Sequence, residues 1–340
     1  MWNGSCAKSL RDALSRKPHI ELDSIEENLG YHASGSLCSR ITNRLLVNVY
    51  KRRIRRDVFD AIKDFKPDVF IAYKGNSLNA NIIKAIRQTG IKTINIYPDC
   101  SPLAYGKVHF KSVSEYDLIL SSKPYHPELW RRLYGLSNTC LYIPHAYDPG
   151  IHLANHYNKN YDYDIGLAAT CRSEYLDFMV NLSDALKHVD ATVAIAGNGW
   201  GKFRKELPEE WSIENAVTGK DYIQWLRKKR ICIAPLTRNV SINGEPHPGD
   251  EDTTRTYELG AGYCFYLHQR TDYLKRNFSE SAEIPMFDNT RELVDLIKFY
   301  LPRENERELC ASGAHNKIVP RFSYDSIADL ILRKINEHFK

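Results

Sequence analysis

The sequence predicts an α/β protein with two consecutive doubly wound domains, each built on a parallel sheet. Apolar runs with strand character alternate with amphipathic helical patterns over most of the 340 residues. A chain of this length accommodates two domains of ordinary size. The alternation stops once, in a polar, turn-rich stretch at 144–162, and then restarts. We therefore expect one domain over residues 1–150, a second over 161–320, and a C-terminal helix over 321–340.

The first half carries short apolar runs separated by amphipathic segments. Strands are predicted at 68–74, 92–97, 117–121 and 140–143, helices at 77–89 and 124–134, and a long amphipathic helix at 39–65. The chain begins with Trp2-Asn3-Gly4-Ser5 ahead of a helical run at 8–15, a pattern typical of the loop that follows a first strand. The first strand of this domain is therefore expected to be missing. Either the domain uses another edge here or its true start lies upstream, and we favour the second interpretation.

The second half repeats the alternation without an internal sequence repeat. Strands are predicted at 164–169, 191–196, 231–236, 263–267 and 283–287. Helices are predicted at 175–187, 222–228, 253–259, 272–278, 290–300, 304–317 and 324–339. A strand followed by a helix, repeated in this way, is typical of a parallel sheet covered by helices.

Composition indicates a globular protein, with 43% hydrophobic and 26% charged residues. The net charge of +5 suits an anionic ligand but is too small to indicate nucleic-acid binding. The eight cysteines form no C-x-x-C pair, which favours free thiols in a reducing compartment over a zinc site. No apolar run approaches the ~20 residues that span a bilayer, and the N-terminus lacks a signal-peptide core. We expect a cytoplasmic protein.

A basic run lies on the predicted long helix, with five positive charges in Lys51-Arg52-Arg53-Ile54-Arg55-Arg56. A basic amphipathic helix of this kind can touch an anionic membrane surface, where each charge contributes about 1 kcal/mol. The alternative is a solvated helix face, offset by the later acids Asp57, Asp60 and Asp64. The sequence favours the solvated face, with weak peripheral membrane contact as the second interpretation.

The segment Asp250–Gly262 is the most informative stretch for function. Thr253 and Thr254 open a predicted helix, and Gly260 and Gly262 close it. Arg255 and Glu258 lie three residues apart on one face of that helix. A helix that starts at the crevice of an α/β sheet, with a guanidinium and a carboxylate at its mouth, is a place where a nucleotide is held.

Several short pieces carry a family resemblance. In the second half they are Tyr-Asp-Ile-Gly-Leu at 163–167 with Arg172 following, Ile-Ala-Gly-Asn-Gly-Trp at 195–200, and Thr-Arg-Thr-Tyr-Glu-Leu-Gly-Ala-Gly at 254–262. In the first half they are the segments 66–75, 97–99 and 143–148. In this order the pieces resemble the GT-B glycosyltransferases, specifically the CgeB-like (spore-protein glycosyltransferase-like) branch of the group 1 enzymes.

The resemblance implies two Rossmann-like domains that face a cleft, with a C-terminal helix packing back on the first domain. It implies a hexosyltransferase-type enzyme that moves a sugar from a nucleotide-sugar donor to an unidentified glycan, protein or small-molecule acceptor. Resemblance to the retaining group 1 enzymes implies retention of anomeric configuration. We also expect no metal ion or other cofactor, because arginines and helix amides can stabilise a diphosphate. Asp250-Glu251-Asp252 satisfies the letters of an Asp-x-Asp metal motif, but an isolated match in an acidic loop is weak support.

For the donor site, the resemblance makes Glu258 the carboxylate that binds the ribose hydroxyls, with Arg255 as a phosphate partner. The alternative is an Arg255–Glu258 surface pair, worth about 0.2–0.5 kcal/mol. Arg172 precedes a helix where a diphosphate would lie, and its alternative is an ordinary exposed arginine. Gly197 and Gly199 are predicted to contact the donor, although their loop lacks the G-x-G-x-x-G spacing and also suits a plain turn.

Two aspartates are the candidate catalytic residues. Related retaining enzymes carry two acids separated by seven residues, and counting back from Glu258 reaches Asp250. A solvated acidic loop is the alternative there. Asp99 follows a strand and would face the cleft, where it could orient an acceptor hydroxyl or the donor sugar; its alternative is a turn residue. His145, at the start of the predicted linker, is a further polar residue for which a structural role is the commoner interpretation.

Two other functions fit the same architecture. One is a catalytically inactive nucleotide- or sugar-binding protein in a coat or envelope assembly, which the missing strand and the departure around Asp250 favour. The other is a nucleotide-sugar epimerase. Turnover of a labelled nucleotide sugar separates the first alternative from a transferase, and analysis of the product separates the second.

Overall fold

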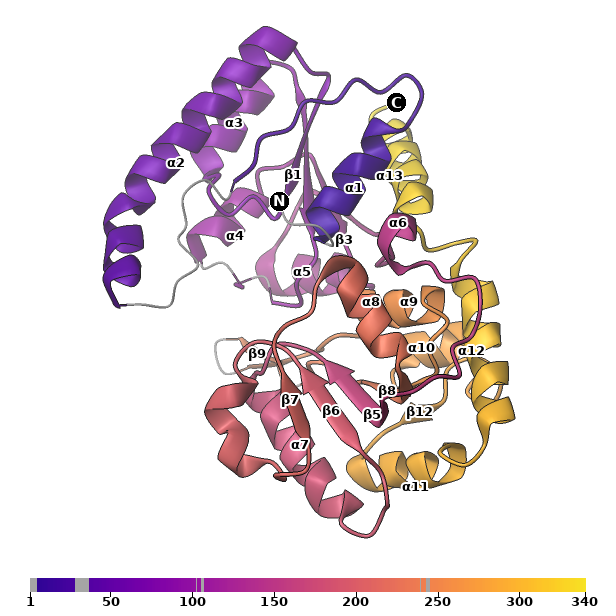
Figure 1. Ribbon diagram of the computed structural model, residues 1–340. Coiled ribbons are helices and arrows are strands. Elements are labelled where there is room, and N and C mark those ends of the chain that lie inside the picture. The colour runs from indigo at the N-terminus through magenta and orange to yellow at the C-terminus, as the bar shows by residue number, and fades with distance from the viewer. Residues whose placement is uncertain (1–4, 28–36, 102, 105–106, 239, 243–244) are drawn as a thin grey trace.

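The computed structural model contains two α/β lobes, each built around its own parallel sheet (Figure 1). It describes residues 5–27, 37–101, 103–104, 107–238, 240–242 and 245–340. The first sheet lies within residues 69–142 and the second within 163–287. The prediction of two doubly wound parallel sheets is therefore confirmed. Among the described helices, none combines the length and the apolar character needed to cross a bilayer.

The first sheet alternates its side chains between two helical layers. Its strands, all parallel and in spatial order, are β1 (Val69–Tyr73), β2 (Lys92–Tyr97), β3 (Leu118–Ser121) and β4 (Thr139–Tyr142). Leu118 and Leu120 pack toward α1 (Cys6–Ser15) and α13 (Tyr324–His338). The opposite face is covered by α2 (Leu37–Phe65), α3 (Ala80–Gln88), α4 (Lys107–Val113) and α5 (His126–Tyr134).

The C-terminal helix belongs to the first lobe in space. Ile327 and Ile331 of α13 share a buried cluster with Leu10 of α1 and with the first sheet, and the two helices lie side by side (Figure 1). The chain therefore crosses between the lobes in both directions. At the crossing, Tyr147 donates its N–H to Phe322 O at 2.9 Å and accepts from Tyr324 N–H at 3.0 Å. The expected return of the C-terminal helix is confirmed.

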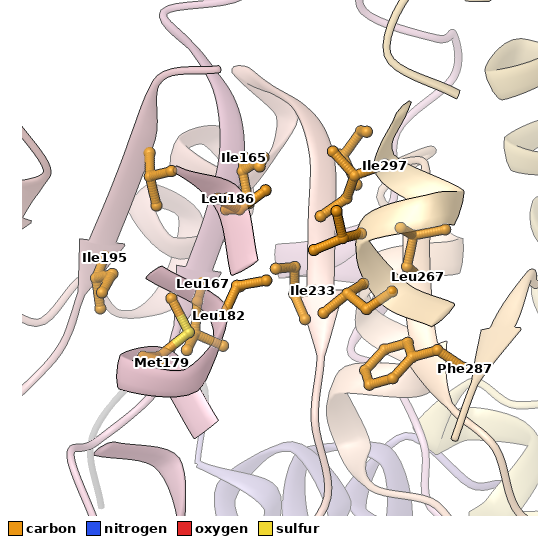
Figure 2. Close-up of a cluster of buried hydrophobic side chains, with 14 of the residues drawn as sticks. Ile165, Leu167, Met179, Leu182, Leu186, Ile195, Ile233, Leu267, Phe287 and Ile297 are labelled. Atoms are coloured by element: carbon orange, nitrogen blue, oxygen red, sulfur yellow. The ribbon is translucent and has the colours of Figure 1, made fainter. Parts of the chain in front are cut away.

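The second sheet is also parallel. Its spatial order is β12 (Met286–Phe287), β11 (Tyr266–Gln269), β8 (Lys229–Ala234), β5 (Tyr163–Ala168), β6 (Val193–Ala196) and β7 (Ser212–Glu214). Helices α7 (Ser173–Leu186) and α11 (Thr290–Tyr300) cover one face, where Met179, Leu182 and Ile297 meet Ile165 and Leu267 (Figure 2). The other face packs against α8 (Gly219–Arg227), α9 (Thr254–Ala261), α10 (Asp272–Asn277) and α12 (Glu304–Ile318).

Some elements differ from the sequence prediction. Those not predicted are α4, α6 (Pro149–His152), η1 (Trp200–Glu206), β7 and an antiparallel pair, β9 (Val240–Ile242) with β10 (Glu245–His247). Strand β11 begins later than predicted, because Tyr263 has a φ of 57° and turns the chain after α9. The predicted opening residues Trp2–Gly4 lie outside the described part of the chain. Of the residues described before β1, none forms a strand.

Candidate functional site

A cleft of about 1950 Å³ lies between the two lobes, and we call it the interlobe cleft. The first lobe contributes the start of α1 and the residues that follow β1, including Lys74 and Asn76. The second lobe contributes the loops after β5, β6 and β7 and the first turns of α9. Ligands of open parallel sheets bind outside the carboxyl ends of the strands, so the cleft is where this architecture holds a ligand.

Glu258 lies in the wall of the interlobe cleft, on α9, with its side chain 12% exposed. Its carboxylate is 3.8 Å from Nε2 of His152. His152 Nδ1 accepts the Asp148 N–H at 3.0 Å, so a neutral ring carries its proton on Nε2, facing Glu258. The alternative interpretation, a surface ion pair between Glu258 and Arg255, is wrong. The two side chains form no ion pair with each other, and Glu258 is largely buried. His152 comes from α6, inside the stretch predicted as a linker.

Arg255 lines the same wall, one turn ahead of Glu258. One guanidinium nitrogen donates to Pro235 O at 3.3 Å, and the group lies 6.0 Å from the centre of the Tyr175 ring. Its Nε is buried and has no partner among the described residues. Burial raises the pKa of the neighbouring Tyr222 hydroxyl, and the Glu258 carboxylate raises it further. Arg255 therefore presents a partly desolvated positive charge at the cleft, and its Nε–H is a hydrogen-bond donor without a partner among the described residues.

Arg172 lies at the point where the loop after β5 enters α7. It is exposed, has an extended backbone with φ −122°, and lines the interlobe cleft. Within the described parts of the chain it makes no ion pair. Its guanidinium is therefore available to an anion in the cleft, as expected for a diphosphate partner.

The loop after β6 packs directly on the loop that carries Arg172. Gly197 has a φ of 154°, and a Cβ there would lie 1.9 Å from Ala169 O. Trp200 Nε1 donates to that same carbonyl at 2.7 Å. Gly197 and Asn198 line the interlobe cleft, whereas Gly199 does not; it adopts a φ of 91° at the start of η1. The structure thus places Gly197 at the predicted site and gives Gly199 a backbone role.

Asp250 also lines the interlobe cleft, but its carboxylate is 14% exposed and bound from the other lobe. Lys123 Nζ donates to its Oδ1 at 2.6 Å, and Cys100 Sγ donates to the same oxygen at 2.8 Å. Burial alone would raise the pKa of the Asp250 carboxyl, but the Lys123 ammonium and the Cys100 hydrogen bond together hold the pKa below its usual value. A solvated acidic loop is therefore wrong for this residue.

The three acids at 250–252 point to different partners. Glu251 Oε1 is 3.4 Å from Arg238, and its Oε2 accepts the Tyr273 N–H at 3.0 Å. Asp252 is fully buried and accepts the Tyr257 hydroxyl at 2.6 Å. Its Oδ1 has no partner in the described structure, and burial raises the pKa of the carboxyl to about 7. Among the described residues, no three His, Cys, Asp or Glu side chains come together as a set of metal ligands.

The loops that follow three successive strands of the first sheet bring their side chains together around Asp250. Cys100 follows β2, Lys123 follows β3 and His145 follows β4. His145 Nε2 accepts from Lys123 Nζ at 3.2 Å, and burial, reinforced by the ammonium, lowers the pKa of this histidine to about 3. Sequence reasoning missed Lys123 and Cys100. Their position directly after buried strands was the available signal.

Asp99 does not reach this cluster. Its carboxylate is 3.5 Å from Lys74 Nζ, both side chains are 36% exposed, and Asp99 is not among the residues that line the interlobe cleft. Lys74 does line the cleft, with an unusual φ of 65° directly after β1. Asp99 therefore lies outside the cleft and contacts Lys74, which lines it.

The glycines that end α9 allow close packing, but mainly between helices. A Cβ on Gly260 would lie 2.3 Å from Ile318 of α12, and one on Gly262 would lie 2.2 Å from Ile223 of α8. The tightest neighbours of both glycines are therefore side chains on other helices. These contacts hold α9 firmly with its first turn at the cleft.

Comparisons with known proteins concern the fold of the whole chain and the sequence of its second half. Residues 174–333 match the model of a family described as "Glycosyl transferase-like". The structure is similar to sucrose-phosphate synthase (tll1590) from Thermosynechococcus elongatus, with a TM-score of 0.68, 10% identity, and coverage of 98% of this chain and 92% of that one. No curated protein matches the sequence.

Two further solved structures extend the comparison. Anabaena Alr3699/HepE in complex with UDP-glucose gives a TM-score of 0.63 at 10% identity, over 85% of this chain and 82% of that one. A glycosyltransferase from Rickettsia africae ESF-5 gives 0.58 at 14% identity, over 94% and 85%. Residues 174–333 therefore match a glycosyl transferase-like family, and the whole chain has the fold of GT-B glycosyltransferase structures, with two Rossmann-like domains.

Proposed function

We propose that the protein transfers a sugar from a nucleotide-sugar donor bound on the second-lobe wall of the interlobe cleft. The observation that carries this proposal is the gathering of Glu258, Arg255 and Arg172 on that one wall, beside the Gly197 loop. A carboxylate next to two guanidinium groups fits a ligand with a diol at one end and a diphosphate beside it.

In this arrangement the ribose hydroxyls donate to Glu258. The diphosphate lies toward Arg172 and Arg255, near the amides at the start of α9, where the helix dipole favours negative charge. Because Glu258 is 12% exposed, hydrogen bonds to it form in a partly desolvated setting and are stronger than in bulk water. The two arginines also stabilise the charge that develops on the diphosphate as it leaves.

The transferred sugar lies toward Asp250, which borders the cleft between donor wall and first lobe. An ionised carboxylate there accepts hydrogen bonds from sugar hydroxyls. The acceptor approaches from the first lobe, where Lys74 lines the cleft and Asp99 pairs with it. We assign Asp99 to the acceptor side, acting by holding Lys74.

Several finer features belong to the same proposal. The short pieces at 163–172, 195–200 and 254–262 support membership of the CgeB-like branch, and the resemblance to group 1 enzymes supports retention of configuration. The arginines support a reaction without a metal ion. Cys6, Cys100, Cys140, Cys171, Cys232, Cys264 and Cys310 are free thiols, which supports a cytoplasmic location. Loss of activity on chelation, restored by manganese, would overturn the metal-independent part.

The test is turnover of a panel of radiolabelled nucleotide sugars. UDP-glucose comes first because the similar Anabaena structure holds it, followed by GDP-, ADP- and dTDP-sugars. The proposal expects slow hydrolysis or transfer with at least one donor, strongly reduced but measurable in Asp250→Asn. Binding without any turnover would instead support the inactive sugar-binding protein. An altered nucleotide sugar as the product would support an epimerase.

A further inference from the structure

We propose that Lys123 is a positioning residue, through which the first lobe holds the Asp250 carboxylate toward the donor sugar. This inference rests on the proposed function, since it assigns a task to a residue behind the same site. It makes the productive form of the donor site depend on contact between the lobes. With the lobes apart, the second lobe alone would present Asp250 without its cation.

The Lys123–Asp250 ion pair lies at the back of the cleft, with Asp250 in the cleft lining and Lys123 behind it. Lys123 is 2% exposed and does not line the interlobe cleft, whereas Asp250 does. Their 2.6 Å separation joins a charged donor to a charged acceptor in a dry setting, where such pairs are strong and directional. Lys123 therefore reaches a bound sugar only through Asp250.

The geometry leaves one carboxylate oxygen for the ligand. Lys123 Nζ and Cys100 Sγ both donate to Oδ1 of Asp250, at 2.6 and 2.8 Å. Lys123 also donates to the neutral His145 ring at 3.2 Å, which fixes the direction of the ammonium. With Oδ1 occupied from the first lobe, Oδ2 is the oxygen that remains for hydroxyls in the cleft.

The backbone of Asp250 itself is bonded within its own lobe, whereas the two residues before it also meet the first lobe, because the Tyr125 hydroxyl lies 2.9 Å from Pro248 O and from Gly249 O. The Asp250 N–H donates to Thr237 O at 2.8 Å, and Arg238 donates to the Asp250 carbonyl at 2.7 Å. Gly249 approaches so closely that a Cβ there would lie 2.1 Å from Thr237 O. Separation of the lobes would keep these two backbone hydrogen bonds of Asp250 and remove the first-lobe groups that orient its side chain, together with the Tyr125 contact to the preceding residues. Coupling between the lobes therefore acts on the carboxylate itself.

The charged surroundings predict a distinct pH signature. The titratable or charged groups around Asp250 are Lys123, Cys100, Tyr125, His126 and His145 from the first lobe, with Arg238, Glu251 and Asp252 from its own lobe. Of the groups that face the carboxylate, Lys123 supplies the positive charge. Without it, burial favours the protonated carboxyl, so an activity that needs the ionised form declines as pH falls.

The test uses Lys123→Met, Lys123→Arg, Asp250→Asn and the double variant Lys123→Met/Asp250→Asn in the full chain. Lys84→Met is the matched control, because Lys84 is 55% exposed and pairs with Glu115 in the same lobe. Donor turnover is measured between about pH 5 and pH 8 with UDP-glucose or the active donor from the panel. UDP affinity is measured by calorimetry.

Lys123→Met should lower kcat by about 10- to 100-fold, the usual cost of a displaced catalytic group, with UDP affinity changed less than about threefold. An acidic limb should appear in its kcat profile, Lys123→Arg should recover most of the rate, and the double variant should be no slower than Asp250→Asn. If Lys123→Met does not fold, Cys100→Ala must still move the acidic limb to higher pH, because the Cys100 hydrogen bond lowers the pKa of Asp250, and Lys123→Arg, which keeps the positive charge, must keep the wild-type profile. Wild-type rates in Lys123→Met, or a uniform loss of rate and affinity, would overturn the inference while leaving the proposed function intact. A wild type inactive with every donor would remove the proposed function itself.

Discussion

Replacing Asp252 by asparagine should stabilise the protein at high pH and not at low pH. The carboxyl is fully buried, accepts one hydroxyl from Tyr257 at 2.6 Å, and leaves its Oδ1 without a partner among the described residues. Burial raises its pKa from 3.8 to about 7. Asparagine keeps the shape and the acceptor for Tyr257 but never ionises.

The sign follows from proton linkage. Between pH 3.8 and about 7 the folded protein holds a proton on Asp252 that the unfolded chain has released. The stabilisation that protonated Asp252 gives the folded protein is therefore fully present below pH 3.8 and is lost as pH rises through about 7. At about 1.4 kcal/mol per pKa unit, the wild type loses about 4 kcal/mol relative to Asp252→Asn across this window.

The assay is urea unfolding of both proteins at about pH 5 and about pH 8.5, followed by tryptophan fluorescence. The measured quantity is the difference in unfolding free energy between variant and wild type at each pH. Asp184→Asn is the matched control, because Asp184 is 66% exposed and pairs with Lys187 at the end of the same helix. A difference for Asp252→Asn that is the same at both pH values would refute the reasoning.

Two further substitutions test the donor wall. Gly197→Ala should lower nucleotide affinity at least about tenfold, because its Cβ would collide with Ala169 O and displace the loop beside Arg172; calorimetry with UDP measures this. Gly201→Ala is its control, since a Cβ there meets nothing within 4 Å, and equal losses in the two variants would contradict the prediction. Arg172→Ala should weaken UDP about tenfold or more, as a lost charged hydrogen bond costs about 1.5–3 kcal/mol, while uridine affinity changes little. An equal loss for UDP and uridine would show that Arg172 does not act on phosphate.

The sheet strands were predictable because their signal is local. Leu118, Ile119 and Leu120 are all fully buried, and a continuous apolar run is the pattern of a strand covered on both faces. The start of β11 was misplaced because a turn at Tyr263, with φ 57°, interrupts an apolar run that gives no sign of it. The short pair β9 and β10 is not apolar enough to show such a pattern.

The residues of the candidate site likewise differ in whether a local sequence pattern reveals them. Glu258, Arg255 and Arg172 were found because each lies in a local pattern, at a helix mouth or after a strand. Lys123 and Asp250 are 127 residues apart in sequence, and no local pattern pairs them. His152 was missed because a polar, turn-rich stretch suggested a linker, although it forms α6 and packs against α8 and α9.

The central claim is that Glu258 holds the nucleotide of a sugar donor, and calorimetric titration of nucleoside diphosphates tests it most directly. Wild type should bind UDP or another member of the set, and Glu258→Ala should weaken that binding about 10- to 150-fold, from the about 1.5–3 kcal/mol of hydrogen bonding to a charged group. Glu308→Ala, at an exposed glutamate that pairs with Lys159, should bind as tightly as wild type. Equal affinity in wild type and Glu258→Ala, or no binding of any diphosphate by the wild type, would contradict the account.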